Sequence, residues 1–208
     1  MIDGIKAAIF DMDGTLLDSL SVWDRVIAEF FGRVNMVPSK TFLDRVGHMS
    51  LREGAALLKE SCGLDATVDR VIEEINERVA RFYEYEVEAK PGVREYLTGM
   101  RSAGVRMCVA TESCRKLAEA ALGRLGLLDF FEFVLSCQEN CTGKNTPGVY
   151  LEAAKRLGAA PGECMVYEDA LYALTTARNA GFATAAVFEP HESRQDEMKR
   201  LADLYLEW

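Results

Sequence analysis

Short apolar runs rich in β-branched residues alternate with helical patterns along most of this chain. The clearest runs are residues 5–10, 105–110 and 164–167, and weaker ones are residues 133–136 and 183–187. Strands that are apolar throughout and separated by helices are typical of a parallel sheet with right-handed crossovers. The pattern therefore predicts the α/β class, with a doubly wound parallel sheet.

One long segment breaks this alternation. Residues 19–88 show helical periodicity throughout, although a parallel crossover needs only about a dozen residues. We therefore expect an all-helical cap domain at 19–88, inserted into a core domain formed by residues 1–18 and 89–208. The connections between the two are expected near residues 17–21 and 85–91.

Composition and charge exclude several classes of protein. Hydrophobic residues make up 49% of the chain, and Lys plus Arg number 24 against 33 for Asp plus Glu, which gives a net charge of -9. The chain has no basic stripe for binding a phosphate backbone, and no uninterrupted apolar segment of about 18 residues. Acidic residues also interrupt the place of a secretion signal. We expect a cytoplasmic protein with neither nucleic acid nor membrane as a partner.

The cysteines do not form an evident metal or disulfide pattern. Six cysteines are scattered without CxxC spacing, and the chain has only two histidines. A zinc cluster therefore lacks ligands, and we expect reduced thiols. The close pair Cys137 and Cys141 is expected to pack rather than to act in redox chemistry.

Two carboxylates and a glycine follow the first predicted strand, in the sequence DMDGT at residues 11–15. The carboxyl ends of parallel strands are where open α/β sheets bind their ligands. Asp11 and Asp13 lie two residues apart, so both can point to one side of the loop and share a cation or divide two roles. The same residue types also occur in ordinary turns, so the ends of the other strands decide between these interpretations.

Polar residues also follow the later predicted strands. Thr111 ends the second strand, and Glu112 and Ser113 follow it before a helical pattern, where a hydroxyl and free amides can bind an anion. We expect Glu112 and Ser113 to contact the substrate. Lys144 lies in a loop just before another helix and offers an ammonium group.

A further pair of acids, Glu168 and Asp169, ends the strand at 164–167. Together with Asp11 and Asp13, four carboxylates would face the single ammonium of Lys144, and such a site repels phosphate. Carboxylate oxygens without imidazole or thiolate ligands suit Mg²⁺. We therefore expect Mg²⁺ as the cofactor, with Asp11, Asp13, Glu168 and Asp169 as its candidate ligands.

These residues suggest a division of catalytic roles. Asp11 would be the nucleophile that attacks phosphorus and forms an aspartyl-phosphate. Asp13 would protonate the leaving oxygen and later accept a proton from water, since crowding raises the pKa of one acid in such a pair. Thr111 and Lys144 would hold the phosphoryl oxygens.

The motifs DMDGT, Thr111, Lys144 in GKNTP and Asp169 in VYEDA resemble the four motifs of the haloacid dehalogenase superfamily. The helical insertion is similar to that of its β-phosphoglucomutase and phosphoglycolate phosphatase branch. The second acid of DxD marks the phosphatases and phosphomutases, because the dehalogenases lack it. The resemblance implies a Rossmann-like core and magnesium-dependent aspartyl-phosphate chemistry beneath a mobile cap that excludes water.

The sequence departs from this family pattern at two places. Gly148 follows Pro147 where family members commonly have Asp, and residues 170–176 lack the usual serine and glycine of the fourth motif. The missing residues remove a hydroxyl near the metal and a position of close backbone approach. We expect reduced activity or a reshaped loop.

Substrate choice is expected to depend on the cap. The segment GHMSLR at 47–52 corresponds to a phosphate-contacting segment of β-phosphoglucomutase, so His48 or Arg52 could contact phosphate. Trp23 stands where that mutase has a cap histidine, which favours a phosphatase. We expect Trp23 to pack in the cap or to form an apolar wall over the substrate.

The leading prediction is a magnesium-dependent phosphatase for a small phosphorylated metabolite, such as a sugar phosphate. One alternative is a phosphohexomutase of the β-phosphoglucomutase kind. The second is a non-catalytic protein that binds phosphorylated ligands, motivated by the altered run at 170–176. The sequence leaves the individual substrate and the oligomeric state open.

Overall fold

The computed structural model describes residues 4–47, 49–140 and 143–208. Within them the core is a six-stranded sheet in which all neighbouring strands are parallel. Its strands, in spatial order, are β5 (Val134–Ser136), β4 (Arg106–Thr111), β1 (Ala7–Phe10), β6 (Cys164–Glu168), β7 (Ala183–Val187) and β8 (Leu204–Leu206).

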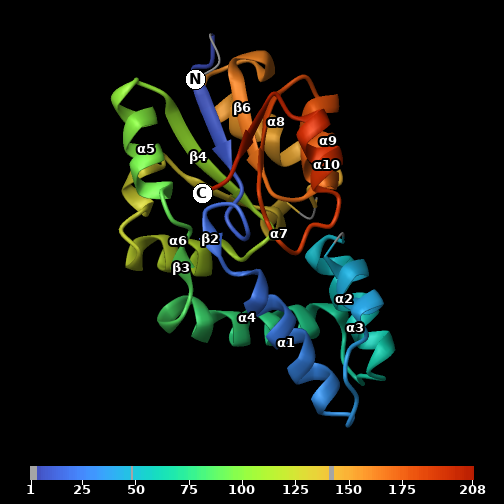
Figure 1. Cartoon of the computed structure of the whole chain (residues 1–208). Helices are drawn as coiled ribbons and strands as arrows, with labels where there is room; N and C mark the ends of the chain where they lie inside the picture. Colours follow the sequence, from blue (N-terminus) through green and yellow to red (C-terminus); the bar gives the residue numbers. More distant parts are fainter. Residues whose placement is uncertain (1–3, 48, 141–142) are drawn as a thin grey trace.

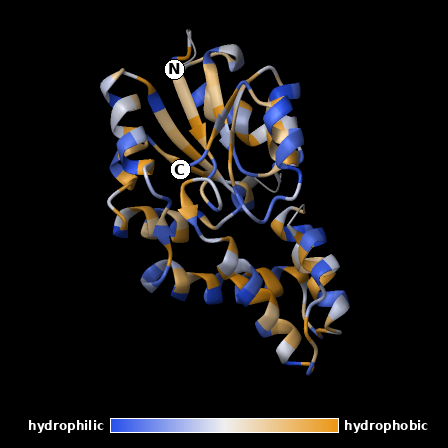
Figure 2. Cartoon of the chain, in the orientation of Figure 1, coloured by the Kyte–Doolittle hydropathy of each residue, from blue (hydrophilic) through white to orange (hydrophobic). Residues whose placement is uncertain are grey.

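Helices cover both faces of this sheet, and the strands lie as an apolar layer between them (Figures 1 and 2). Alternate residues of β1 pack on opposite faces of the sheet. Phe10 belongs to the hydrophobic core that includes residues of α5 and α6, and Ile9 belongs to the core that includes residues of α8 and α9. The apolar pattern of the strands thus follows from burial on both sides. The flanking helices are α5 (Val93–Ser102), α6 (Arg115–Arg124), α8 (Gly148–Arg156), α9 (Leu171–Asn179) and α10 (Gln195–Leu201).

The chain changes direction across the sheet at β1. It first adds β4 and β5 on one side of β1, then returns to add β6, β7 and β8 on the other. The carboxyl ends of β4, β1 and β6 therefore meet at a topological switch point, where open α/β sheets bind ligands. The short helix α7 (Cys137–Asn140) follows β5 at this edge, and the 3-10 turns η1 (Leu128–Phe130) and η2 (Pro161–Glu163) precede β5 and β6.

Four helices between β1 and α5 lie beyond the carboxyl edge of the sheet (Figure 1). The two chain segments that lead to and from them pair as a short antiparallel ladder, in which Leu17 faces Ala89. This arrangement supports the predicted inserted cap, and the division into two domains stays a prediction. The elements are β2 (Leu17–Asp18), α1 (Leu20–Gly32), α2 (Lys40–Val46), α3 (Leu51–Ser61), α4 (Val68–Tyr85) and β3 (Glu88–Ala89).

Helix α4 shows why the cap segment is helical. Val71, Ile75, Val79 and Phe82 are spaced three or four residues apart and are buried on one face. Thr67 caps the helix, because its hydroxyl accepts a hydrogen bond from the third backbone amide of the helix at 3.2 Å. The apolar face of α4 packs against α1, α3 and α6.

The five strands predicted from the sequence all form. The sequence analysis did not predict β8, α10 or the β2–β3 pair, because two or three residues of strand carry no measurable period and α10 has only one buried residue, Met198. The five described cysteines are free thiols, as expected; Cys141 lies outside the described residues. None of the described helices is long and apolar enough to cross a membrane.

Candidate functional site

The ends of β1, β4 and β6 bring the predicted acids together. Asp11 directly follows β1, and its amide donates a hydrogen bond to the carbonyl of Tyr167 at 2.9 Å, which continues the ladder between β1 and β6. Carboxylate oxygens of Asp11, Glu168 and Asp169 all lie within 4.8 Å of one another. All three side chains are buried. Residues far apart in the chain thus form one acidic group.

Lys144 lies at the centre of this acidic group and is only 2% exposed. Its ammonium donates to Glu168 Oε1 at 2.7 Å and also contacts Asp11 Oδ1. The hydroxyl of Tyr150, on α8, donates to the same Glu168 oxygen at 2.7 Å. A buried ammonium paired with two carboxylates fixes their positions, since leaving any one of these charges unpaired is strongly unfavourable.

Burial shapes the protonation of this group. Burial raises the pKa of Glu168 to about 8, against the opposing effect of Lys144. The pKa values of Asp11 and Asp169 are raised for the same reason, and neighbouring acids add to the effect. Although burial opposes the charged form of Lys144, Asp11 and Glu168 hold its pKa well above the ordinary value. Burial and the neighbouring acids thus favour the protonated forms of these carboxyl groups, and a bound cation would favour their ionised forms.

A divalent cation fits this donor set. Asp11 Oδ2 is buried and has no hydrogen-bond partner among the described residues. An unpaired buried carboxylate oxygen is costly, and a hard cation is a partner that suits it. With Glu168 and Asp169 beside it, Asp11 offers carboxylate oxygens of the type that Mg²⁺ prefers.

The turn after β1 approaches Asp169 closely. Gly14 has a φ of +83°, and a Cβ at this position would lie 2.2 Å from Asp169 Oδ2. The hydroxyl of Thr15 donates to Asp169 Oδ1 at 3.1 Å. The glycine of DMDGT is thus required both by its backbone conformation and by the space that the acid occupies.

The carboxylate of Asp13 lies outside the acidic group formed by the other predicted metal ligands. It accepts hydrogen bonds from Ser19 at 2.6 Å, from Ser113 at 2.7 Å, and from the hydroxyl of Tyr83. Tyr83 belongs to cap helix α4, whereas Ser113 belongs to the core. The hydrogen bond from Tyr83 to Asp13 therefore depends on the position of the cap. The contact between Asp13 and a metal ion stays a prediction.

Sequence reasoning missed Tyr83, Ser19 and Tyr150 as members of the site. For Tyr83, the only sequence signal is a hydroxyl on the buried face of a predicted helix. Burial raises the pKa of Tyr83 well above its ordinary value, and the charge of Asp13 adds to the effect. Such a hydroxyl needs a partner when it is buried. The pattern gives no indication of which partner the fold supplies.

The lining of the cavity includes the polar residues that follow the second predicted strand, Thr111, Glu112 and Ser113. Two of them are joined by a hydrogen bond. The hydroxyl of Thr111 accepts the amide hydrogen of Ser113 at 3.0 Å. The carboxylate of Glu112 accepts the amide hydrogen of Lys144 at 2.8 Å, so it positions the lysine loop. Burial raises the pKa of Glu112. Their contacts with substrate stay predictions.

The three predicted cap residues differ in placement. Trp23 lines the cavity. Arg52 pairs with Asp69 at 2.5 Å between exposed side chains and is absent from the described lining of the cavity. His48 lies outside the described residues. Of the two that the structure describes, Trp23 lines the cavity and Arg52 does not.

The altered run after the fourth motif still starts a helix at the site. The amide of Leu171 donates to Glu192 Oε2 at 3.1 Å, so the first turn of α9 is capped from the loop after β7. Burial opposes the charge of Glu192, yet hydrogen bonds from Arg194 and from this amide lower its pKa. A carboxylate at a helix start is favourable. The start of α9 is thus capped by an acid that lies 21 residues further along the chain, and a change in loop shape relative to the family stays a prediction.

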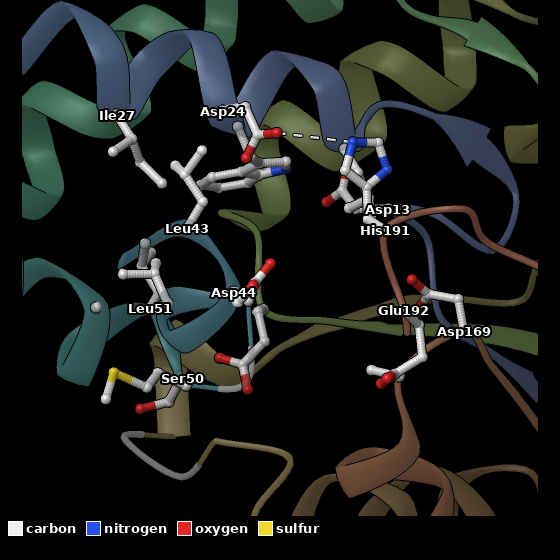
Figure 3. Close-up of a pocket in the computed structure, with 18 of the residues that line it drawn as sticks. Asp13, Asp24, Ile27, Leu43, Asp44, Ser50, Leu51, Asp169, His191 and Glu192 are labelled. Carbon is white, nitrogen blue, oxygen red and sulfur yellow. Dashed lines mark ion pairs between the residues drawn. The ribbon is translucent and has the colours of Figure 1, made fainter. Parts of the chain in front are cut away.

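The predicted residues at the strand ends, together with Trp23, line a cavity of about 520 Å³ between core and cap. Figure 3 shows Asp13, Asp169, His191 and Glu192 at one end of it. His191 lies in the loop after β7, and its Nε2 atom is 3.6 Å from Oδ2 of Asp24 on cap helix α1 (Figure 3). The volume is that of a site for a small molecule. The sequence analysis did not single out His191, Glu192 or Asp24.

The fold and this arrangement define a carboxylate-rich site at the switch point of an open parallel α/β sheet. The chain matches the haloacid dehalogenase-like hydrolases over residues 5–181 and belongs to that family. YhcW of Bacillus subtilis (strain 168) is 30% identical over 207 residues, which cover 95% of this chain and 94% of the relative.

One further relative and one solved structure are also similar to this chain. The phosphorylated carbohydrates phosphatase of Thermotoga maritima is 28% identical over 180 residues, covering 85% of this chain and 82% of the relative. The crystal structure of CbbY from Rhodobacter sphaeroides, in complex with phosphate, has a TM-score of 0.84 at 22% identity. The alignment covers 97% of this chain and 93% of that chain, and it shows that the fold is shared.

Proposed function

We propose that the protein is a magnesium-dependent phosphatase that hydrolyses a small phosphorylated metabolite, such as a sugar phosphate, through an aspartyl-phosphate on Asp11. The observation that carries the proposal is the buried group of Asp11, Glu168, Asp169 and Lys144 at the switch point. The name of the Thermotoga maritima relative supports phosphorylated carbohydrates as the substrate class.

Asp11 would act as the nucleophile. One carboxylate oxygen forms a bond to phosphorus while the bond between phosphorus and the alcohol oxygen breaks. The ammonium of Lys144 contacts Asp11 and would also balance charge on the phosphoryl oxygens. Mg²⁺ held by Asp11, Glu168 and Asp169 would neutralise charge on the phosphoryl group.

Asp13 would move the protons. In the first step it gives its proton to the departing alcohol oxygen, and in the second it takes one from the water that attacks the aspartyl-phosphate. That attack releases inorganic phosphate and restores Asp11. The hydroxyls of Ser19, Ser113 and Tyr83 hold the carboxylate of Asp13 in place for this exchange.

A mutase needs a second grip for phosphate, and the described contacts do not favour one. Arg52 is paired with Asp69 on the cap surface. Lys40 is the cation that the cap contributes to the described lining, and it is exposed. The geometry therefore supports hydrolysis better than transfer between two positions of one sugar.

The test is a panel of phosphorylated metabolites, scored for phosphate release with Mg²⁺ and with a chelator, and separately for isomer interconversion. We expect metal-dependent phosphate release that Asp11→Asn abolishes. Interconversion of isomers would overturn the phosphatase proposal in favour of a mutase. Binding of phosphorylated ligands without turnover would overturn it in favour of a binding protein.

A further inference from the structure

The lining of the cavity changes in character between its two ends. The core end carries the acidic group and Lys144, whereas the cap end is lined by apolar side chains of helices α1, α2, α3 and α4. Asp24 of α1 and His191 of the loop after β7 also line the cavity, and Figure 3 shows them pointing toward each other. A polar pair, one member from the cap and one from the core, thus faces the same cavity as the acidic group.

Buried side chains hold His191 in one orientation. Its Nδ1 atom donates a hydrogen bond to Glu189 Oε1 at 2.6 Å. The other oxygen of Glu189 accepts a hydrogen bond from the ammonium of Lys90 at 2.7 Å, and the side chains of Lys90 and Glu189 are only 9% and 3% exposed. A carboxylate that binds one ring nitrogen of a histidine determines which nitrogen stays available. Nε2 of His191 is therefore the nitrogen that a ligand in the cavity can reach.

The contact between His191 and Asp24 leaves room for a hydrogen-bonding ligand. Nε2 of His191 and Oδ2 of Asp24 lie 3.6 Å apart, and both side chains are 43% exposed. A hydrogen bond between nitrogen and oxygen spans about 2.7–3.2 Å, so both atoms keep hydrogen-bonding capacity for a bound molecule. One ligand oxygen can lie about 2.8 Å from both atoms at once, because twice that distance exceeds their separation.

A hydroxyl group suits this pair of side chains. When the imidazole is protonated, one hydroxyl accepts a hydrogen bond from Nε2 and donates its own hydrogen to Asp24. When the imidazole is neutral, two neighbouring hydroxyls donate to Nε2 and to Asp24. An ionised second phosphate would lie near the carboxylates of Asp24 and Asp44, which both line the cavity. An alkyl chain would leave the polar atoms of the pair without a partner.

We propose that His191 and Asp24 determine substrate specificity by forming hydrogen bonds to hydroxyl groups of the sugar part of the substrate. This inference rests on the proposed phosphatase activity, and it names the residues that select sugar monophosphates over alkyl phosphates and bisphosphates. Glu189 and Lys90 are positioning residues, because they hold the imidazole and make no contact with the substrate themselves.

The first experiment compares three sugar phosphates with two analogues that lack hydroxyls, all assayed with Mg²⁺. The sugar phosphates are glucose 6-phosphate, fructose 1-phosphate and sorbitol 6-phosphate, and the analogues are cyclohexylmethyl phosphate and n-hexyl phosphate. The hydroxyl preference is kcat/KM for the best sugar phosphate divided by kcat/KM for the better analogue. We expect a preference of about tenfold or more, because the hydroxyls bind charged partners.

The outcomes separate the specificity proposal from the phosphatase proposal. Metal-dependent hydrolysis of both series without a hydroxyl preference overturns the specificity proposal and leaves the phosphatase standing. Faster hydrolysis of fructose 1,6-bisphosphate than of fructose 1-phosphate has the same consequence. No metal-dependent hydrolysis of any phosphate in either series overturns both proposals.

Two substitutions of His191 separate the role of Nε2 from a structural role. His191→Asn keeps an amide near the position of Nδ1, which Glu189 binds, but has no atom at the position of Nε2. It should lower the hydroxyl preference by about tenfold, mainly by raising KM for sugar phosphates, and leave kcat/KM for the analogues unchanged. His191→Gln carries its amide near the position of Nε2 and should recover part of the preference.

The analogues report any structural effect of these substitutions. An equal decrease of kcat/KM for sugar phosphates and analogues in His191→Asn would show a structural role and overturn the proposal. A hydroxyl preference in His191→Gln that is no higher than in His191→Asn would contradict the role of Nε2.

A matched pair of substitutions on α1 tests the cap side of the pair. Asp24→Ala should lower the hydroxyl preference by about tenfold, because the carboxylate that accepts the substrate hydroxyl is lost. Glu29→Ala is the control, since Glu29 is an exposed acid of the same helix and is not among the described residues that line the cavity. Equal hydroxyl preferences in the two variants would overturn the assignment of Asp24.

Discussion

The core end and the cap end of the cavity are built in different ways. At the core end, Asp11 and Glu168 extend from neighbouring parallel strands and pair with the buried Lys144. At the cap end, helices α1, α2, α3 and α4 contribute apolar side chains to the lining. Backbone hydrogen bonds between strands hold the attached charged groups in fixed positions, whereas the apolar side chains on a helix face can differ in size and shape. The charged and the apolar parts of the lining thus come from different parts of the chain, and Tyr83 of α4 is the cap side chain that hydrogen-bonds Asp13.

The largest effect should come from removing the nucleophile at the core end. Asp11→Asn should reduce kcat by about 10⁴-fold or more, because removing a catalytic nucleophile typically has an effect of this order. Phosphate release under saturating substrate measures it. Asp129→Asn is the matched control, since Asp129 is exposed and is not among the described residues that line the cavity. Comparable rates in both variants would contradict the role of Asp11.

A smaller effect should come from the cap residue that reaches the core end. Tyr83→Phe removes one hydroxyl hydrogen bond to Asp13, and hydrogen bonds to charged groups contribute about 1.5–3 kcal/mol. We expect kcat to fall by roughly tenfold, with a displaced pH profile. Tyr85→Phe on the same helix is the control, because Tyr85 is 72% exposed. Identical pH profiles for the two variants would refute a role for Tyr83.

The metal-free core end should make the protein less stable as the pH rises. Burial raises the pKa of Glu168 from 4.5 to about 8, and those of Asp11 and Asp169 are raised too. The folded chain then holds protons that the unfolded chain has lost, so the contribution of these acids to stability is fully present below about pH 4.5 and is lost as the pH rises toward 8. Because metal binding requires deprotonated ligands, the stabilisation by Mg²⁺ should increase over the same range.

Thermal melting between pH 5 and pH 8, with chelator and with Mg²⁺, measures this dependence. Each kcal/mol of change in the free energy of unfolding corresponds to a change of roughly 2–4 °C in the melting temperature for a chain of this size. Glu168→Gln should flatten the metal-free slope, since the amide does not titrate. A metal-free melting temperature that increases toward pH 8 would contradict the prediction.

The smallest effect compares the two tryptophans of the chain. Trp208 donates a hydrogen bond from its indole nitrogen to the carbonyl of Thr15 at 2.9 Å, beside the turn of the first motif. The indole nitrogen of Trp23 is buried without a partner among the described residues. Trp208→Phe should therefore lower the melting temperature by about 2–4 °C more than Trp23→Phe, which corresponds to about 1 kcal/mol. Equal decreases in the melting temperature of the two variants would contradict a stabilising role for this hydrogen bond.

The acidic residues of the site could be located from sequence because each follows a run of apolar residues that only a buried strand explains. Asp11, Thr111 and Glu168 were predicted at strand ends, and the parallel topology then required them to share one edge. Asp13 is predicted as a metal ligand together with Asp11, Glu168 and Asp169; its carboxylate accepts hydrogen bonds from Ser19, Ser113 and Tyr83, and its metal contact stays a prediction. Side-chain direction within a loop depends on contacts that spacing does not encode.

The residues that close the cavity could not be found in this way. Glu192 and His191 belong to a loop without regular structure, and Tyr83 looks like any buried position of an amphipathic helix. Each acquires a role through a partner far away in the chain, such as Leu171 for Glu192 and Asp24 for His191. No local periodicity carries this information.

The sequence by itself determined the alternation of strands and helices, the long helical insertion and the acids at the strand ends, because burial and backbone geometry impose local periods on the residues. Only the tertiary structure decided that Lys144 lies between Asp11 and Glu168 and that four cap helices leave an apolar end to the cavity. These features depend on distances between segments remote in sequence, and such distances follow from packing of the whole chain.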